Sequence, residues 1–421
     1  MKESRKPFFN LLKDKKFWFI LAVGLLLRAV LMVITLHSDL WAVVFSQYLA
    51  VFKGVTNIYD YLGTLGPSSP IVQNYGRNFF TYPPLAYFTF GLFGLILRVF
   101  YNADFMSNLA ATLPTVLSDD RLFWHLFWFK FPYLIFDLGV LWLLTKLFGD
   151  GEKKWLVFIL WLFNPLAFYT SFMIGQFDII PVFWVLLSLM LVKQKKINWA
   201  AFCLGVGGAY KMFPLFFLPF LAVNEGKNLW QKGKLFLIGL APYLTTILPF
   251  LGSASFRQNV LFSNQSQKIL FAKINVSGAE YLSLFVVFYV GLLLLTNFKK
   301  MVLWKWFLMV MLVLFSLTHY HQQWFLWLSP LLVIFWAEYP DKRIYPLIFF
   351  CSWFLITLFF EPSLSISLFA PISPSLKEVT SLADLANRFF DAFLLKSLIR
   401  SVFAGVALAI SWPLVSGHEK K

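Results

Sequence analysis

The feature that most constrains this chain is a series of apolar segments longer than any soluble core could bury. The first, Phe17 to Leu36, has twenty residues and a single charge, Arg28. Twenty apolar residues in a helix are long enough to cross the hydrocarbon core of a membrane. Hydrophobic residues make up 59% of the chain and charged residues only 13%, whereas soluble domains carry about 25% charged residues. These numbers exclude a soluble, disordered, coiled-coil or disulfide-stapled protein.

Eleven further apolar segments follow, and together they predict an all-α polytopic membrane protein with about twelve transmembrane helices. An even number of crossings places both termini on one side, and the basic residues near the first span and in later turns identify that side as the cytoplasm. The predicted spans after 17–36 are 82–101, 124–148, 155–172, 177–192, 198–221, 234–251, 281–298, 301–318, 322–337, 343–360 and 396–415.

Three stretches between spans are too long for plain turns and are expected outside the cell: 37–80, 252–280 and 361–395. The first contains an aromatic-rich run, 40–52, that is too short to span and predicts an interfacial helix. We therefore divide the chain into an N-terminal module, an outer loop and a variable C-terminal transmembrane module, over residues 1–252, 253–280 and 281–421.

Strict alternation of the spans conflicts with the positive-inside rule in one region. It places Lys193, Lys195 and Lys196 outside and the polar segment Gly175–Asp178 inside. Both conflicts disappear if segment 155–172 is re-entrant and 198–221 is a hairpin that turns near Lys211. Broken backbone of this kind is tolerated where it lines a wet cavity, and we favour this version.

The net charge of +16 does not indicate a nucleic-acid partner, because the basic residues lie in short runs between apolar segments. That pattern is typical of positive-inside topology and of contact with anionic membrane lipids. The two cysteines, Cys203 and Cys351, both lie in apolar segments and are expected to be packing residues. No Cys/His spacing typical of a metal site is present, so we predict no metal.

Ionisable residues at membrane depth are costly unless they are paired or hydrated, so each one needs a reason. Arg28, Lys130 and Asp137 are expected to form an internal charge network, since Lys130 and Asp137 lie two helical turns apart on one face. Asp39 follows the first span directly. It is interpreted as the cap of the next helix, as a carboxylate that takes a proton at the outer membrane face, or as both, since a cap position would fix its direction.

The remaining polar residues predict a substrate-binding site on the outer side. A lysine at membrane depth beside a chain break, Lys211, can hold a phosphate, with His321 as a second donor. The Gly-Gln-Phe-Asp break is expensive unless it lines a wet chamber, which places its two polar residues beside Asp39. The other candidate binding residues are Gln176, Asp178, Tyr82, His319 and Gln322. No phosphate-binding loop or dinucleotide turn is present, so a sugar donor would have to be lipid-linked.

In their order along the chain, these motifs resemble the GT-C superfamily of polytopic glycosyltransferases. The nearest similarity is to prokaryotic polyprenyl-phosphate-mannose-dependent mannosyltransferases and to the mannosyltransferases of GPI-anchor assembly. The motifs are Asp39 after the first span, Tyr82-Pro83-Pro84, Lys130 with Pro132 and Asp137, Asn164-Pro165 before Gly175–Asp178, Lys211 with Pro214, and His319–His321.

The resemblance implies that 1–252 is the catalytic module and that Asp39 is the catalytic base of an inverting transfer. The donor would be a polyprenyl-phosphate hexose, mannose by analogy, and the acceptor a hydroxyl of a lipid-linked or other glycan. It implies no cofactor, and because Asp39 has no acidic neighbour we expect no metal dependence. The expected location is a bacterial or archaeal cell membrane, or the endoplasmic reticulum in a eukaryote, with the site facing outside.

Two alternatives remain open. Twelve spans with both ends inside also suit a lipid or sugar transporter or flippase, although the internal repeat that often marks transporters is not visible. A transferase of the same fold could instead act on protein or on a wall polymer.

Overall fold

The computed structural model describes residues 15–111, 116–149 and 151–416, and over these residues it is helical apart from one hairpin. The hairpin pairs β1 (Lys273–Val276) with β2 (Glu280–Ser283) in antiparallel register. In this part of the chain five helical segments are long and apolar enough to cross a membrane. The prediction of an all-α membrane protein is therefore confirmed. The five segments are α2 (Lys15–Ile34), α9 (Leu122–Leu147), Glu152–Ile174, Leu229–Phe250 and α23 (Ala392–Ser416).

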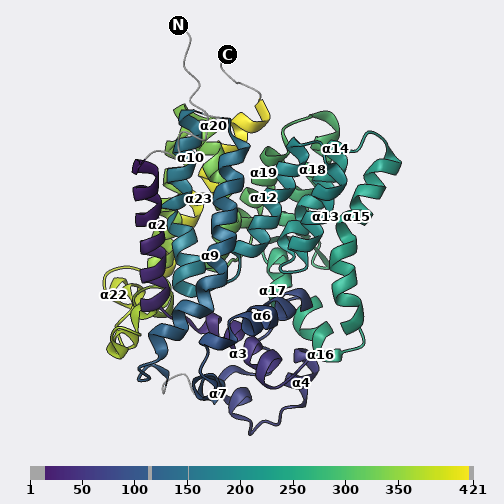
Figure 1. Ribbon diagram of the computed structural model, residues 1–421. Coiled ribbons are helices and arrows are strands. Elements are labelled where there is room, and N and C mark those ends of the chain that lie inside the picture. The colour runs from purple at the N-terminus through teal and green to yellow at the C-terminus, as the bar shows by residue number, and fades with distance from the viewer. Residues whose placement is uncertain (1–14, 112–115, 150, 417–421) are drawn as a thin grey trace.

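The helices run between two ends of the molecule (Figure 1). We call the end where α2 begins and α23 finishes the upper end, and the opposite one the lower end. The shared upper end agrees with the prediction that both termini lie on one side; the terminal basic residues themselves, 1–14 and 417–421, lie outside the described residues. The lower end holds the helices between α2 and α9: α3 (Ser38–Phe52), α4 (Ile58–Thr64), α5 (Pro70–Tyr75), α6 (Pro84–Ile96) and α7 (Ala103–Ala111).

The other helices are shorter, and several are broken by polar or proline-containing segments. They are α10 (Glu152–Leu162), α11 (Pro165–Ala167), the π-helix η2 (Phe168–Ile174), α12 (Ile179–Lys193), α13 (Ile197–Gly208), α14 (Leu218–Glu225), α15 (Leu229–Ile247), α16 (Ala254–Phe256), α17 (Asn264–Gln267), α18 (Leu284–Phe298), α19 (Leu303–Leu317), the 3-10 helix η7 (Gln322–Trp327), α20 (Ser329–Glu338), α21 (Ile344–Leu358) and α22 (Leu382–Ala386).

The pairing of α2 with α9 shows that α6 does not cross the membrane. Arg28 of α2 contacts Asp137 of α9, whereas Thr35, just after α2, contacts Lys130 of α9. The two helices are therefore antiparallel, and the chain between them leaves and returns at the same lower end. A single crossing by α6 would contradict this. The predicted span 82–101 is wrong: Pro84–Ile96 packs beside α3 at the lower end (Figure 1).

Without that span, α9, α10 and α12 run opposite to the directions that strict alternation predicts, and this resolves the conflict over the lysines. α9 now finishes at the upper end, where the ammonium of Lys193 donates to the carbonyl of Leu147 at 2.5 Å. Lys153, at the start of α10, pairs with Glu338, at the end of α20, over 2.9 Å. The lysines that follow α12 therefore lie at the same end as the termini, as the positive-inside rule requires.

Two hairpins enter from the upper end and turn within the molecule. The first descends through α10 and η2, turns at Gly175–Asp178 and returns through α12. The second descends through α13, breaks at 209–212 around Lys211 and returns through α14. The predicted hairpin over 198–221 is confirmed, but the predicted re-entrant segment is wrong: residues 152–174 run once from the upper end to the tip at Gly175–Asp178 and do not return to the side on which they start. The turn of the first hairpin is at Gly175, where the backbone has a φ of +81°, a conformation that favours glycine.

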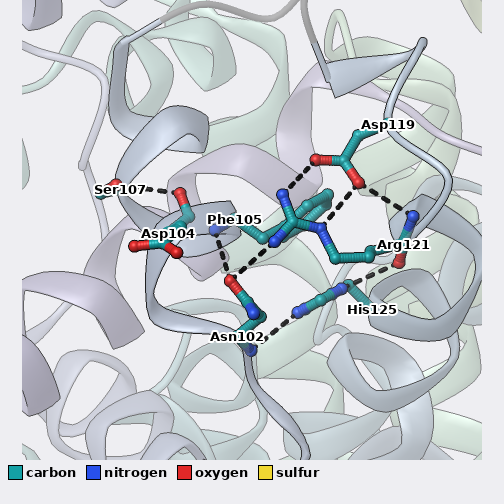
Figure 2. A network of polar contacts seen from close by, with 7 residues as sticks. All are labelled: Asn102, Asp104, Phe105, Ser107, Asp119, Arg121 and His125. Atoms are coloured by element: carbon teal, nitrogen blue, oxygen red, sulfur yellow. Dashed lines mark hydrogen bonds and ion pairs between the residues drawn. The ribbon is translucent and has the colours of Figure 1, made fainter.

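A polar network fixes the lower end onto the start of α9 (Figure 2). The guanidinium of Arg121 pairs with Asp119 at 2.7 Å and donates to the side chain of Asn102 at 2.9 Å. The Nε2 atom of His125 accepts from the backbone N–H of Asn102, and its ring stacks on Phe105 with centroids 3.8 Å apart. The loop before α7 is thereby held against α9, on the same side as α3.

This topology predicts which loops share a side of the membrane. In a background lacking Cys203 and Cys351, single cysteines at the exposed positions Thr64 and Asp120 should react alike with a membrane-impermeant thiol reagent in intact cells. A cysteine at the exposed position Gln194 should show the opposite accessibility. If Asp120→Cys instead behaved like Gln194→Cys, α6 would cross the membrane after all.

Candidate functional site

The candidate site lies where the tips of the two hairpins meet the start of α3. Three breaks between helices converge there: Gly175–Asp178, the segment around Lys211, and the residues between α19 and η7. α6 lies against the tips, because Thr89 is 2.9 Å from the hydroxyl of Tyr210 and the rings of Phe90 and Phe177 are 4.9 Å apart. Most of the predicted binding residues lie on these segments.

Asp39 is the most accessible acidic group of this site, with a side chain 32% exposed. It lies in the first turn of α3, and the cap of this helix is His37, whose Nδ1 accepts the backbone N–H of Asp39 at 3.1 Å. The interpretation of Asp39 as the cap is therefore wrong. Burial lowers the pKa of His37, which keeps that ring neutral and able to accept. The carboxylate is left free for other partners.

The partner of the Asp39 carboxylate is Gln323, a residue that sequence reasoning missed. Its Nε2 donates to Oδ2 of Asp39 at 2.8 Å. The predicted residue was its neighbour Gln322, which the structure turns away from the site. Gln322 is buried, and its side chain accepts from the hydroxyl of Thr357 on α21 at 3.0 Å. In η7 consecutive side chains point in different directions, so only one of the two glutamines faces Asp39.

Lys211 and Asp178 form a buried ion pair between the two hairpin tips. The ammonium is 2.7 Å from Oδ2 of Asp178, and the indole N–H of Trp327 donates to Oδ1 at 2.5 Å. The ammonium also lies over the ring of Phe177, 4.6 Å from its centroid. Lys211 thus already has a carboxylate partner, which the separation of 33 residues in sequence had hidden.

Gln176 and Tyr82 connect the first hairpin tip with the segment before α6. The side-chain Nε2 of Gln176 donates to the hydroxyl of Tyr82 at 3.0 Å. Burial raises the pKa of Tyr82, and the nearby charges of Asp39 and Asp178 raise it further. Tyr82 therefore stays a neutral phenol between the two carboxylates. The Oε1 atom of Gln176 is buried, and no group among the described residues donates to it.

His321 faces a lysine that no sequence motif had singled out. The ammonium of Lys268, in the outer loop, is 2.9 Å from Nε2 of His321 and lies over the ring of Trp324. Burial, and then the charge of Lys268, lowers the pKa of His321 to about 4. His321 is therefore a neutral acceptor at physiological pH. The charges of Asp39 and Lys211 also act on His321, so both groups lie near it.

His319 lies at the edge of this group. Its ring centroid is 6.4 Å from that of His321, and burial lowers its pKa, with the charges of Lys268 and Arg400 lowering it further. Its side chain has no hydrogen bond among those that the structure describes at the site.

The predicted charge network exists, but it lies outside the candidate site and consists of two separate groups of contacts. Arg28 pairs with Asp137 at 2.7 Å, and the indole of Trp161 donates to the same carboxylate at 3.1 Å. Lys130 takes no part in this pair. Its ammonium donates instead to carbonyl oxygens at the end of α2 and in η2, those of Thr35 at 2.7 Å and of Met32 and Phe172 at 3.0 Å.

The site therefore combines one accessible carboxylate with three nearby basic side chains: Asp39 with Lys211, Lys268 and His321. Among the described residues, no group of three or more His, Cys, Asp or Glu side chains is placed to hold a metal ion. Such an arrangement can accept a proton at one point and hold an anion at another. Comparisons of the chain with protein-family models, with curated proteins and with solved structures find no match.

The buried Arg28–Asp137 pair predicts a large loss of stability when one partner is neutralised. Asp137→Asn leaves the guanidinium of Arg28 without a counter-charge, so we expect a destabilisation of roughly 3–5 kcal/mol. The matched control is Glu338→Gln, which removes the exposed pair with Lys153 and should cost about 1 kcal/mol or less. Thermal unfolding in detergent measures both, and equal losses would show that the buried pair is not special.

Proposed function

We propose that this protein is an inverting glycosyltransferase that uses a lipid-linked sugar phosphate as its donor. The observation that carries the proposal is that the Asp39 carboxylate is bound by Gln323 of η7, two residues after the histidine that contacts Lys268. Transfer of a sugar from a phosphate needs a base for the incoming hydroxyl and a cationic site for the departing phosphate. The candidate site supplies both from rigid segments.

In the proposed reaction Asp39 takes a proton from the acceptor, and the cationic side chains bind the departing phosphate. A hydroxyl of the acceptor donates its proton to Asp39 while its oxygen forms a bond to the anomeric carbon. The bond between that carbon and the phosphate oxygen breaks, and the oxygen leaves with the electron pair. Attack from the opposite face inverts the anomeric configuration. Only a carboxylate that is both held in place and accessible can serve here, and Asp39 is both.

The phosphate-binding role fits Lys268 with His321 better than Lys211 with His321. Lys211 is already neutralised by Asp178 at 2.7 Å, whereas the structure gives Lys268 the neutral ring of His321 as its partner. An ammonium beside a neutral imidazole has no counter-charge in that partner, so it can pair with an anion. Lys211 and Asp178 then serve to hold the two hairpin tips together beneath the sugar.

The proposal includes the orientation of the chain in its membrane. The lower end, with the site, faces outside, and the lysine-rich upper end faces the cytoplasm. The short helices complete about twelve membrane segments in a GT-C-type arrangement, with α3 to α7 as the interfacial part. The donor is a polyprenyl-phosphate hexose, mannose by resemblance, and the acceptor is a lipid-linked or other glycan, which places the reaction in glycolipid biosynthesis.

The proposal predicts that Asp39→Asn removes most of the transferase activity. The amide still accepts a hydrogen bond from Gln323 but no longer takes a proton, so the rate should fall about 10²–10⁴-fold. The assay is transfer of labelled mannose from a polyprenyl-phosphate donor by the purified protein. The control is Asp120→Asn, which changes an exposed carboxylate away from the site. Near-normal transfer by Asp39→Asn would refute the role of Asp39, and lipid movement without transfer would indicate a transporter.

A second prediction separates the two lysines of the outer loop. Lys268→Met should weaken donor binding roughly ten- to 150-fold, because a hydrogen bond to a charged group contributes about 1.5–3 kcal/mol. Lys273→Met is the matched control, since that ammonium lies on β1 over the ring of Tyr281, 4.6 Å from its centroid. The measurement is the KM for the donor at saturating acceptor. Equal effects of the two substitutions would remove Lys268 from the phosphate site.

A further inference from the structure

The hydrogen bond between Gln323 and Asp39 fixes the orientation of the glutamine amide. An ionised carboxylate only accepts hydrogen bonds, so the group of Gln323 that faces Asp39 is the amide nitrogen, 2.8 Å from Oδ2. The carbonyl oxygen, Oε1, then has to find a donor of its own. It is buried, and among the residues that the structure describes none donates to it.

The backbone at Gln323 is held in place by contacts with two other elements. Its carbonyl accepts from the hydroxyl of Thr170 in η2 at 3.1 Å. The preceding residue, Gln322, accepts from the indole of Trp353 through its carbonyl at 3.1 Å and is anchored to α21. Gln323 is in addition only 5% exposed, so the direction of its side chain is set by packing.

A buried acceptor without a donor is a cost that native structures rarely carry outside functional sites. A phosphate does not relieve it, since the phosphate oxygens at neutral pH are acceptors themselves. A sugar hydroxyl does, because it donates as well as accepts. Gln176 repeats the pattern at the other side of the site: its nitrogen donates to Tyr82 and its Oε1 is buried without a donor.

We propose that Gln323 positions Asp39 and also selects the acceptor, by accepting a hydrogen bond from the hydroxyl next to the one that attacks. This inference rests on the proposed transferase function. Asp39 and Oε1 of Gln323 present neighbouring acceptors, and two adjacent hydroxyls on one sugar ring are the matching donors. The preferred acceptors are therefore vicinal diols, and Gln323 is a specificity-determining residue for them.

The test uses a polyprenyl-phosphate mannose donor and octyl α-mannoside as the acceptor, together with its four monodeoxy analogues. The protein is held in nanodiscs, because glycosidic detergents would compete for a sugar site. In the wild type one analogue should lose all transfer, since it lacks the attacking hydroxyl. A second analogue, lacking the neighbouring hydroxyl, should lose about tenfold or more in kcat/KM, because Oε1 then stays unpaired.

The decisive comparison is the ratio of kcat/KM for the second analogue to kcat/KM for the parent glycoside, measured in Gln323→Met. This variant keeps the volume of the side chain but has no Oε1, so the second analogue should react as well as the parent glycoside does. Gln322→Met is the matched control: it alters a neighbouring buried glutamine that faces α21, and it should keep the wild-type ratio. An unchanged penalty in Gln323→Met overturns the inference, whatever happens to the absolute rate or to stability.

A binding measurement keeps this inference separate from the proposed function. If the wild type transfers mannose to none of the glycosides, the proposed function is refuted for this donor and acceptor pair. Octyl α-mannoside should nevertheless raise the thermal midpoint of the wild type, and the second deoxy analogue should raise it less. Equal shifts from both glycosides in the wild type would overturn the role of Gln323 independently of catalysis.

Discussion

The contact between α2 and α9 is the interaction on which the rest of the architecture depends. It joins Arg28 to Asp137 deep in the bundle and Lys130 to the carbonyls at the end of α2, and so it fixes the two helices antiparallel. The described residues between 35 and 121 are thereby kept at one end of the molecule. Asp39 is the second residue of the helix that starts there. The position of its carboxylate therefore depends on the contact between α2 and α9, two to three helical turns away.

Pairing with an opposite charge and hydrogen bonding also explain how charged groups are tolerated at the hairpin tips. Asp178 is fully buried, yet it accepts from both Lys211 and Trp327, so neither of its oxygens is left bare. A buried pair of this kind adds little net stability against an apolar alternative, but breaking it is costly. The pair links the tips of the two hairpins.

The sequence predicted those parts of the site that have a local signal. The breaks at Gly175–Asp178 and Lys211 interrupt apolar runs, and Asp39 is a carboxylate that follows the first span. α6 was misjudged because residues 82–101 have the length and hydropathy of a span, and only its pairing with α3 shows otherwise. Gln323 was missed because it differs from Gln322 only in the direction of its side chain, and Lys268 because its partner lies 53 residues away.

The closure of the site by η7 has a consequence for biosynthesis. Asp39, Asp178 and Lys211 all precede residue 212, whereas Gln323 and Trp327, which complete their hydrogen bonds, are made more than one hundred residues later. A nascent chain therefore inserts both hairpins while their polar tips are only partly satisfied. The site is therefore completed last, when segments made early in synthesis meet η7, which is made late. In a chain truncated before Gln322, Asp39 would lack its hydrogen bond from Gln323, and Asp178 would lack its hydrogen bond from Trp327.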